Sequence, residues 1–326
     1  MKKILYFLLL FTTYILRAQD IDLSKLQMGS YMYNQYVYNP AAGGMYETDF
    51  SANMVARIQW AGVSGAPVTS YGWADHRFRK NSMSAGLAYT YDQFGSNKYF
   101  DVGGNYTYII RLNNKLKLNL GLRAGMVNYE WTPGKTFDAG DVLAVPVSIQ
   151  YPKFGTGAQL YTRKYYLSLG LPDIAPFNNS QFASDREQSF FAKNRSIILM
   201  AGYRLKISDG FSLYPNGKIY YYYSASKARN DIGPFQLAGK AVPFRADASL
   251  IAEITDYFWA GASYATTGSA SIMAGSYMSS RIRFMYAYEF MTSAKNINQS
   301  LDIHEITLML QLDDLFARKN KSTIEE

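Results

Sequence analysis

Residues that commonly carry catalysis are scarce in this sequence. It contains two histidines, His76 and His304, and no cysteine. Glu305 follows His304 directly, and because adjacent side chains of a strand point to opposite faces, this pair cannot form a catalytic dyad. His304 with a serine of the adjoining first strand is the one hydrolase arrangement that remains, and a structural histidine is the better interpretation. Two histidines so far apart do not indicate a metal site.

Binding motifs for phosphates or bases are also missing. Gly103-Gly104 and the pair Gly121/Gly125 fall within predicted strands, where glycine relieves crowding or permits a bend. The tyrosines at 220–223 could stack on bases or sugars, but at the outer end of a strand they favour an interfacial aromatic girdle. The formal charge of +8 is scattered along the chain. We therefore expect no enzyme activity, no cofactor and no nucleic-acid partner.

Period-two alternation dominates several stretches of about ten residues. In 115–126 the even positions are apolar: Leu116, Leu118, Leu120, Leu122, Ala124 and Met126. The odd positions are polar or small: Lys115, Lys117, Asn119, Gly121, Arg123 and Gly125. The stretches 244–254 and 281–290 alternate in the same way. Such segments predict strands with one face toward lipid and the other toward water or a polar filling.

The alternation predicts about fourteen antiparallel strands. They lie near residues 48–61, 68–79, 82–94, 98–112, 115–131, 154–163, 165–175, 195–207, 211–223, 242–254, 257–267, 270–278, 280–290 and 301–312. Every second connection is a tiny turn, whereas the long connections 133–153, 176–194, 224–241 and 291–300 all fall on the other side. Outer-membrane barrels sort their loops in this way, with short turns in the periplasm, and a tyrosine-rich soluble β-sandwich has no reason to do so. The fold class is therefore all-β, a transmembrane antiparallel β-barrel over 48–312.

Both chain ends agree with export to the outer membrane. A basic start and an apolar stretch over 4–16 predict a signal peptide of residues 1–18. Without cysteine there is neither a lipoprotein anchor nor a disulfide. Residues 19–47 are predicted to be an N-terminal periplasmic extension or plug, and residues 313–326 a charged periplasmic tail.

Charged residues of both signs are expected on the inner face of the wall. The alternation assigns this face Arg57, Arg111, Lys117, Arg123, Arg204, Arg245, Asp247, Glu253, Arg281, Arg283, Glu289 and Glu305. A closed barrel can join such groups in ion-pair networks, whereas a diffusion pore needs an open water column. About fourteen strands give a bore between filled small barrels and aqueous porins. We expect a mostly occluded lumen, with 19–47 as the candidate plug.

Two motifs stand at the start of the mature chain. The first comprises Tyr31-Met32-Tyr33-Asn34, then Asn39-Pro40-Ala41 and Gly43, and the second comprises Arg57-Ile58-Gln59-Trp60, then Gly62, Gly65-Ala66-Pro67 and Thr69. They resemble the motifs QYMFNP…NPAYAG and RxQWxGxxGAPxT of the PorP/SprF family of outer-membrane proteins from Bacteroidetes. Leu169-Gly170-Leu171-Pro172 and His304-Glu305-Ile306 also match in place and order. The sequence departs from the family at Gln35, where proline is common, and at Ala42-Gly43, which replaces Tyr-Ala-Gly.

This resemblance implies a non-enzymatic role in type IX secretion and gliding motility. The implied partners are outer-membrane lipid, a periplasmic ring lipoprotein, and a secreted surface protein such as an adhesin, held through its C-terminal domain. The residues implied as structural or partner contacts are Tyr31, Asn34, Asn39, Pro40, Arg57, Gln59, Trp60, Gly65, Pro67, His304 and Glu305. A porin-like solute channel is the alternative, and conductance without partners would distinguish it.

Overall fold

Antiparallel strands make up most of the structure, a computed structural model that describes residues 28–78, 82–132, 146–174, 194–224, 235–237, 240–242, 244–254, 257–292 and 302–313. The predicted signal peptide, residues 19–27 and tail residues 314–326 lie outside this part of the chain. The strands are β1 (Phe50–Gln59), β2 (Val68–Phe78), β3 (Met83–Phe94), β4 (Asn97–Arg111), β5 (Lys117–Trp131), β6 (Val147–Tyr161), β7 (Tyr165–Leu171), β8 (Asn194–Tyr203), β9 (Leu205–Ser208), β10 (Phe211–Ser224), β11 (Phe235–Leu237), β12 (Lys240–Val242), β13 (Phe244–Ile254), β14 (Phe258–Ala265), β15 (Ser269–Tyr277), β16 (Ile282–Met291) and β17 (Ile303–Leu312). A short helix α2 (Gln35–Tyr38) and a 3-10 turn η1 (Pro40–Ala42) precede them. Neither of these helical pieces is long and apolar enough to cross a membrane.

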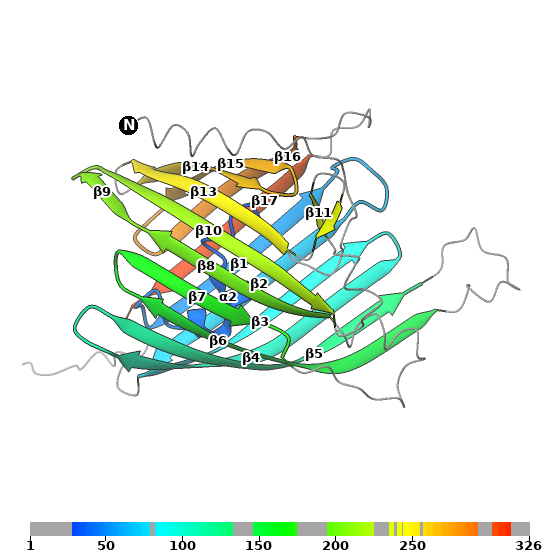
Figure 1. The fold of residues 1–326 in the computed structure, drawn as a ribbon, viewed down its shortest axis with the longest axis horizontal. Helices are drawn as coiled ribbons and strands as arrows, with labels where there is room; N and C mark the ends of the chain where they lie inside the picture. Colours follow the sequence, from blue (N-terminus) through cyan, green and yellow to red (C-terminus); the bar gives the residue numbers. More distant parts are fainter. Residues whose placement is uncertain are drawn as a thin grey trace, which may run out of the picture.

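Fourteen of the strands form one closed antiparallel barrel (Figure 1). Consecutive strands pair with one another, and β17 closes on β1 from Phe50↔Leu312 to Gln59↔Ile303. The small hairpin β11–β12 stands apart, because β10 pairs directly with β13. The extra strand β9 pairs only with β10 among the described strands. The predicted fold class, an all-β barrel of about fourteen strands, is confirmed.

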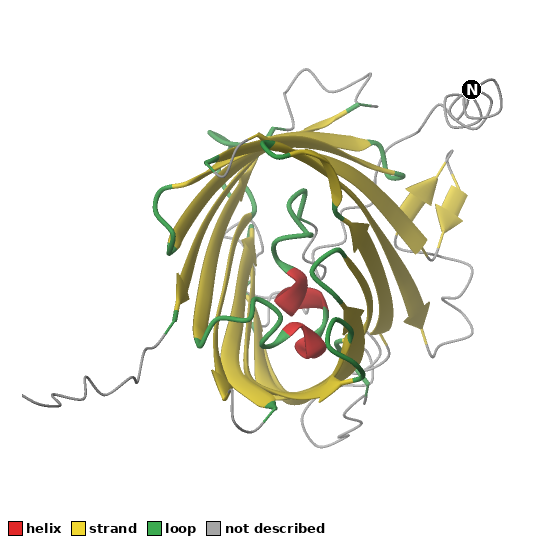
Figure 2. Cartoon of the chain, turned by 90° about the vertical axis from the view of Figure 1, so that its left-hand side faces the viewer, coloured by secondary structure: helices red, strands yellow, loops and turns green. Residues whose placement is uncertain are grey.

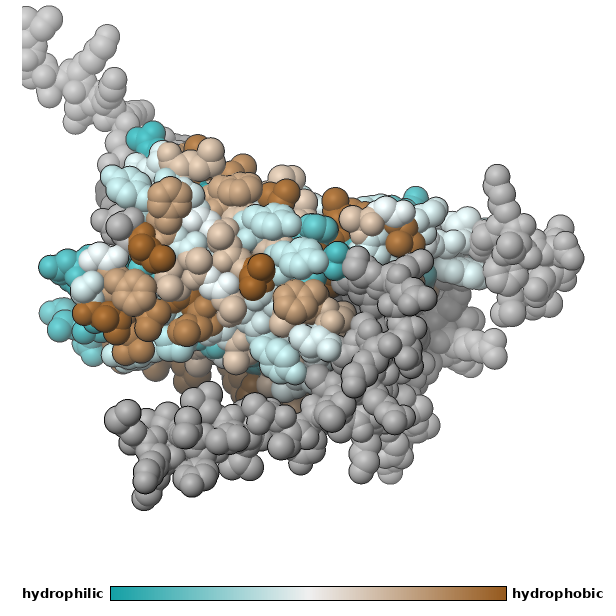
Figure 3. Space-filling view, turned by 90° about the horizontal axis from the view of Figure 1, so that it is seen from above, coloured by the Kyte–Doolittle hydropathy of each residue, from teal (hydrophilic) through white to brown (hydrophobic). Residues whose placement is uncertain are grey.

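Side chains alternate across the wall as the sequence predicts. On β5, Leu120 and Leu122 are 45% and 59% exposed, whereas Asn119 is fully buried. Figure 3 shows apolar side chains over much of the outer wall, which would be unfavourable in water but suits lipid. The expected tyrosine girdle at 220–223 alternates instead, with Tyr220 buried and Tyr221 on the outer face.

The connections sort by length between the two ends of the barrel. We call the end where β1 begins and β17 ends the proximal end, which lies on the left of Figure 1, and the opposite end the distal end. All proximal connections are short, namely 79–82, 112–116, 162–164, 209–210, 255–257 and 278–281. The long connections 132–146, 172–193, 225–243 and 292–302 are all distal. The predicted sorting is confirmed.

Several strand bounds differ from those predicted. β6 begins at Val147 rather than at 154, and the sequence hid its first half because Pro152 interrupts the pattern. The strand expected over 195–207 divides at Arg204 into β8 and β9. The hairpin β11–β12 lies in a segment expected to be loop. These differences lie at strand ends and in connections, so the order of the strands is unaffected.

Candidate functional site

The barrel interior holds residues 28–47, here called the luminal segment (Figure 2). It starts beside β15, where a Cβ on Gly29 would meet Ser271 Oγ, and it ends at the proximal end. There the carboxylate of Glu47 pairs with Lys117 of β5. Although burial acts in the opposite direction, the hydrogen bond and charge of Lys117 lower the pKa of Glu47. The segment is thus tied to the wall along its whole length.

Three glycines let the backbone of the luminal segment touch the wall. Gly121, Gly157 and Gly170 are direct neighbours across β5, β6 and β7, and we call them the glycine strip. A Cβ on Gly121 would lie 2.2 Å from the nitrogen of Ala41, and one on Gly157 would lie 1.9 Å from Oδ1 of Asn39. No larger residue fits at these positions without displacing the luminal segment.

Asn39 and Pro40 shape the turn that lies on the glycine strip. Oδ1 of Asn39 accepts a hydrogen bond of 2.8 Å from the backbone nitrogen of Ala41, which caps the 3-10 turn that Pro40 starts. Its Nδ2 donates to the carbonyl of Ala158 at 3.0 Å and to Oγ of Ser168 at 2.7 Å. The side chain of Asn39 therefore stabilises the turn and also attaches it to the wall.

We expect Asn39→Ala to lower the free energy of unfolding by roughly 2–4 kcal/mol, because three buried hydrogen bonds are lost, one of which caps the 3-10 turn. Asn39→Asp, which retains the capping oxygen but turns an unpaired, buried carboxylate oxygen toward the carbonyl of Ala158, should lose at least as much. Urea unfolding in lipid vesicles, followed by tryptophan fluorescence, measures both. A wild-type midpoint for Asn39→Ala would contradict this assignment.

Aromatic stacking joins the luminal segment to two well-separated strands of the wall. Tyr33 stacks on Trp259 of β14 with ring centroids 4.6 Å apart, and Tyr36 stacks on Trp73 of β2 at 4.9 Å. The hydroxyl of Tyr36 also donates to Asp75 at 3.3 Å. Sequence reasoning missed both tryptophans and Asp75. Their inward position in the strand alternation was the available signal.

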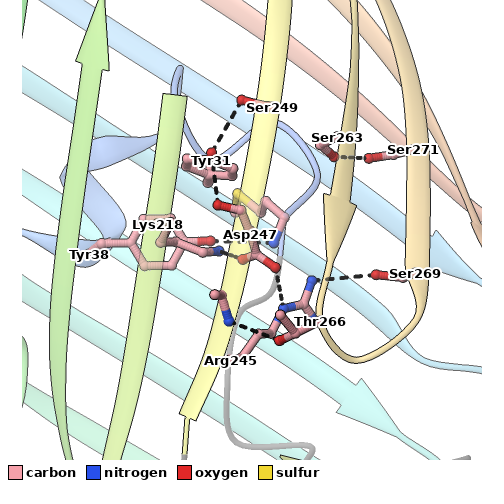
Figure 4. Close-up of polar contacts among 12 residues, drawn as sticks. Tyr31, Tyr38, Lys218, Arg245, Asp247, Ser249, Ser263, Thr266, Ser269 and Ser271 are labelled. Atoms are coloured by element: carbon pink, nitrogen blue, oxygen red, sulfur yellow. Dashed lines mark hydrogen bonds and ion pairs between the residues drawn. The ribbon is translucent and has the colours of Figure 1, made fainter. Parts of the chain in front are cut away.

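A buried charge cluster holds two further tyrosines (Figure 4). The ammonium of Lys218 lies 4.7 Å from the ring centroids of both Tyr31 and Tyr38, and 2.8 Å from a carboxylate oxygen of Asp247. Nε of Arg245 donates to the same carboxylate at 2.6 Å. A cation removed from water needs such partners, so the luminal segment completes the surroundings of Lys218.

A second charge cluster unites residues from both family-like motifs and the last strand. Nη1 of Arg57 lies 2.9 Å from Glu289 and 3.4 Å from Glu305, and all three side chains are buried. The hydroxyl of Ser30 donates to Glu305, and Nδ2 of Asn34 donates to that hydroxyl at 2.9 Å. The structure thus brings Asn34, Arg57 and Glu305 into one network.

The rest of the second motif lies at the distal end, in the connection between β1 and β2. The nitrogen of Gln59 donates to the carbonyl of Pro67 at 3.0 Å, and that of Trp60 donates to Asp302 at 2.8 Å. Trp60 and Gly65 adopt positive φ angles of 55° and 75°. These residues shape the first distal turn, and Trp60 joins it to the chain entering β17.

His304 lies on the outer face of the barrel. Its Nδ1 is 2.7 Å from the hydroxyl of Tyr286, whereas Glu305 is buried on the inner face, as the sequence predicts. The register pairs His304 with Ile58 and places Ser51 opposite Gln311, so β1 offers no serine to a hydrolase site. Within the described residues no group of three His, Asp or Glu could hold a metal ion.

Most of the charges expected inside the barrel are there. Those that are buried include Arg57, Arg245, Asp247, Glu289 and Glu305. Arg111, the last residue of β4, and Arg281, directly before β16, continue the inward-facing positions of these strands but are exposed at the proximal end. Arg204 is also largely exposed and reaches Glu253 at 3.0 Å. Alternation assigns a face, but it does not tell how far along the wall the closed interior extends.

Comparisons with known proteins agree with this architecture. The family model for type IX secretion system membrane protein PorP/SprF matches residues 22–310. No curated protein sequence matches the chain. Among solved structures, the Ralstonia pickettii toluene transporter TbuX is 11% identical with a TM-score of 0.50, covering 87% of this chain and 94% of that chain. The CymD monoaromatic hydrocarbon channel is 14% identical with a TM-score of 0.49, covering 90% and 95%. At such identities the likeness concerns the fold alone.

Proposed function

Because this chain belongs to the type IX secretion system membrane protein PorP/SprF family, we propose that it helps to secrete a surface protein, or to anchor it through its C-terminal domain. The protein is an outer-membrane β-barrel of that secretion system. We infer a non-enzymatic role, in which the barrel offers binding surfaces to other proteins.

The luminal segment inside the barrel is the observation that supports this proposal. The luminal segment rests on the glycine strip, stacks on tryptophans of β2 and β14, and completes two buried charge clusters. A solute pore requires a continuous water column, and the luminal segment occupies interior space that such a column would need. A barrel with a segment fixed inside it in this way suits a platform in the membrane.

The two ends of the barrel suit different partners. We propose that the proximal end, with its short turns, faces the periplasm and a ring lipoprotein there. The distal end would then face outward, where its long connections offer area for a secreted protein. This orientation follows the rule that outer-membrane barrels keep short turns in the periplasm.

Deleting the chain from its host tests the proposal. We expect a surface protein to be lost from the cell surface, as measured by surface labelling and mass spectrometry, and restored when the wild-type chain is supplied. The purified barrel should give no large, stable conductance steps in planar bilayers. Large steps, together with an unchanged set of surface proteins, would contradict the proposal and favour the porin-like channel.

A further inference from the structure

Basic side chains gather at two adjoining turns of the proximal end, β4–β5 and β6–β7. Arg111 ends β4 and lies directly opposite Lys117 of β5, and Lys117 lies directly opposite Tyr161 of β6. These three positions form a row that continues the inner face of the wall. Arg163 lies just beyond Tyr161, in the β6–β7 turn. We call Arg111, Lys117 and Arg163 the cation group.

The cation group carries more positive charge than its surroundings neutralise. Among the described residues, Glu47 at the end of the luminal segment is the carboxylate that pairs with it. Glu47 pairs with Lys117, and its other oxygen lies 4.0 Å from Nη2 of Arg163, whose side chain is 92% exposed. Arg111 is exposed and forms no ion pair within the part of the chain that the structure describes. Two guanidinium groups therefore reach the surface with little or no compensating charge.

The position of Arg111 opposite Lys117 is unfavourable by itself. Directly opposite residues of an antiparallel pair have Cβ atoms roughly 4.5–5.5 Å apart, and like charges in such a pair destabilise the sheet. Glu47 compensates Lys117 and leaves Arg111 without a carboxylate. An anion bound beside the guanidinium groups of Arg111 and Arg163 would relieve this repulsion, so the arrangement favours a ligand that brings negative charge.

The basic surface extends beyond the cation group onto the tips of the two turns. Lys115 and Lys164 are exposed there. Oδ1 of Asn113 accepts from the backbone nitrogen of Lys115 at 2.9 Å, which fixes the first tip. Oγ1 of Thr162 accepts from that of Lys164 at 3.0 Å, which fixes the second. A single small anion would meet only part of this surface, whereas an extended peptide with several carboxylates can pair with all of it.

We propose that the cation group binds an extended, acidic segment of a periplasmic partner protein. The inference rests on the proposed function, which places the proximal end in the periplasm, and it names the chemistry by which the partner is recognised. Carboxylates of the segment pair with Arg111 and Arg163, and the lysines at the turn tips add attraction at longer range.

The strand pattern favours a protein segment over the headgroups of lipids. Arg111 and Lys117 occupy positions that continue the inner face of β4 and β5. The outward-facing positions beside them are Ile110 and Leu118, which pair with each other across the two strands and are apolar. The cations are thus directed toward the interior side of the proximal end, where a protein segment can reach them and the surrounding bilayer does not.

Binding of fluorescent octaglutamate to the purified full-length barrel in detergent tests the inference. Fluorescence anisotropy should show binding that octaglutamine lacks and that weakens with added salt, because salt screens exposed charges. Arg111→Gln combined with Arg163→Gln should weaken binding by at least about fivefold, since two exposed charge pairs are lost. The matched control, Lys98→Gln combined with Arg281→Gln, removes the same charge at exposed positions outside the two turns and should bind like the wild type.

Crosslinking in intact cells identifies the occupant. A photoreactive amino acid in place of Lys115 should crosslink to a segment of another protein that is rich in aspartate and glutamate. The double variant at Arg111 and Arg163 should abolish this crosslink, whereas the control pair should retain it.

Two results would overturn the inference. One is equal octaglutamate binding by the two double variants, and the other is crosslinks only to phospholipid or to residues 314–326 of this chain. Either result would leave the proposed function standing if the deletion strain still loses a surface protein. If that strain keeps its surface proteins unchanged, the proposed function fails, and this inference fails with it.

Discussion

Gly157→Val is expected to give the barrel large, stable conductance steps that the wild-type protein lacks. A Cβ at this position lies 1.9 Å from Oδ1 of Asn39, much closer than the 2.8 Å to the carbonyl oxygen of Leu169 on β7, and the two methyl groups of valine extend farther. The wall is held by ladders on both sides of β6, whereas the turn at Asn39 is held by a few hydrogen bonds. The luminal segment should therefore be displaced from the glycine strip, while β6 stays in place.

Planar-bilayer recordings measure this effect, and limited proteolysis of the folded barrel reports whether residues 28–47 become accessible. Gly104→Val is the matched control, because a Cβ there has as its nearest neighbour the carbonyl of Gly86, at 4.0 Å. It makes the same change in a strand without touching the luminal segment. If the Gly157→Val barrel gave no conductance steps and resisted the protease, the glycine strip would not be needed to hold the luminal segment in place.

Arg57→Met should lower the free energy of unfolding by about 3–5 kcal/mol, because it leaves the carboxylates of Glu289 and Glu305 buried without their guanidinium partner. Burying a charge is tolerated only when it is paired and hydrogen-bonded. The midpoint of urea unfolding in lipid vesicles measures the loss.

Two further variants separate lost pairing from lost packing. The triple variant Arg57→Met, Glu289→Gln, Glu305→Gln should recover part of the stability, because neither carboxylate is left without its guanidinium partner, although Arg245 loses the neighbouring charge of Glu289. Lys206→Met breaks a pair with Asp209 in which the side chains are 66% and 101% exposed, and it should leave the midpoint unchanged. If Arg57→Met behaved like Lys206→Met, the buried network would have no role in stability.

The sequence predicts the barrel well because the bilayer imposes its rule at every second position. Leu120 and Leu122 alternate with Asn119 and Gly121 because one face of the strand meets lipid and the other meets the interior. This requirement is independent of the rest of the chain, so the local pattern suffices to place the strands. Where that rule does not act, prediction failed. Near the distal end, the first half of β6 lacks the pattern, and β11–β12 was expected to be loop.

The candidate site was predicted less completely, because its contacts join strands distant in sequence. The sequence alone gives no sign that Gly121 contacts the luminal segment. Only the register shows that Gly157 and Gly170 lie beside it and form the glycine strip. Asn34 and Glu305 meet through Ser30, which belongs to neither motif. The family resemblance named Asn34, Asn39 and Arg57 but gave no geometry, and the contacts with Trp73, Trp259 and Lys218 emerge only from the closed barrel.

The stacking of Tyr33 on β14 and of Tyr36 on β2 has a mechanical consequence. A hollow fourteen-stranded cylinder could flatten under the lateral pressure of the bilayer by bending its hydrogen-bonded ribbon. Here one short stretch of chain acts as an internal brace between two strands that lie five positions apart in the wall. The cross-section of this barrel is therefore set from within, and its rims keep a constant outline for whatever docks on them.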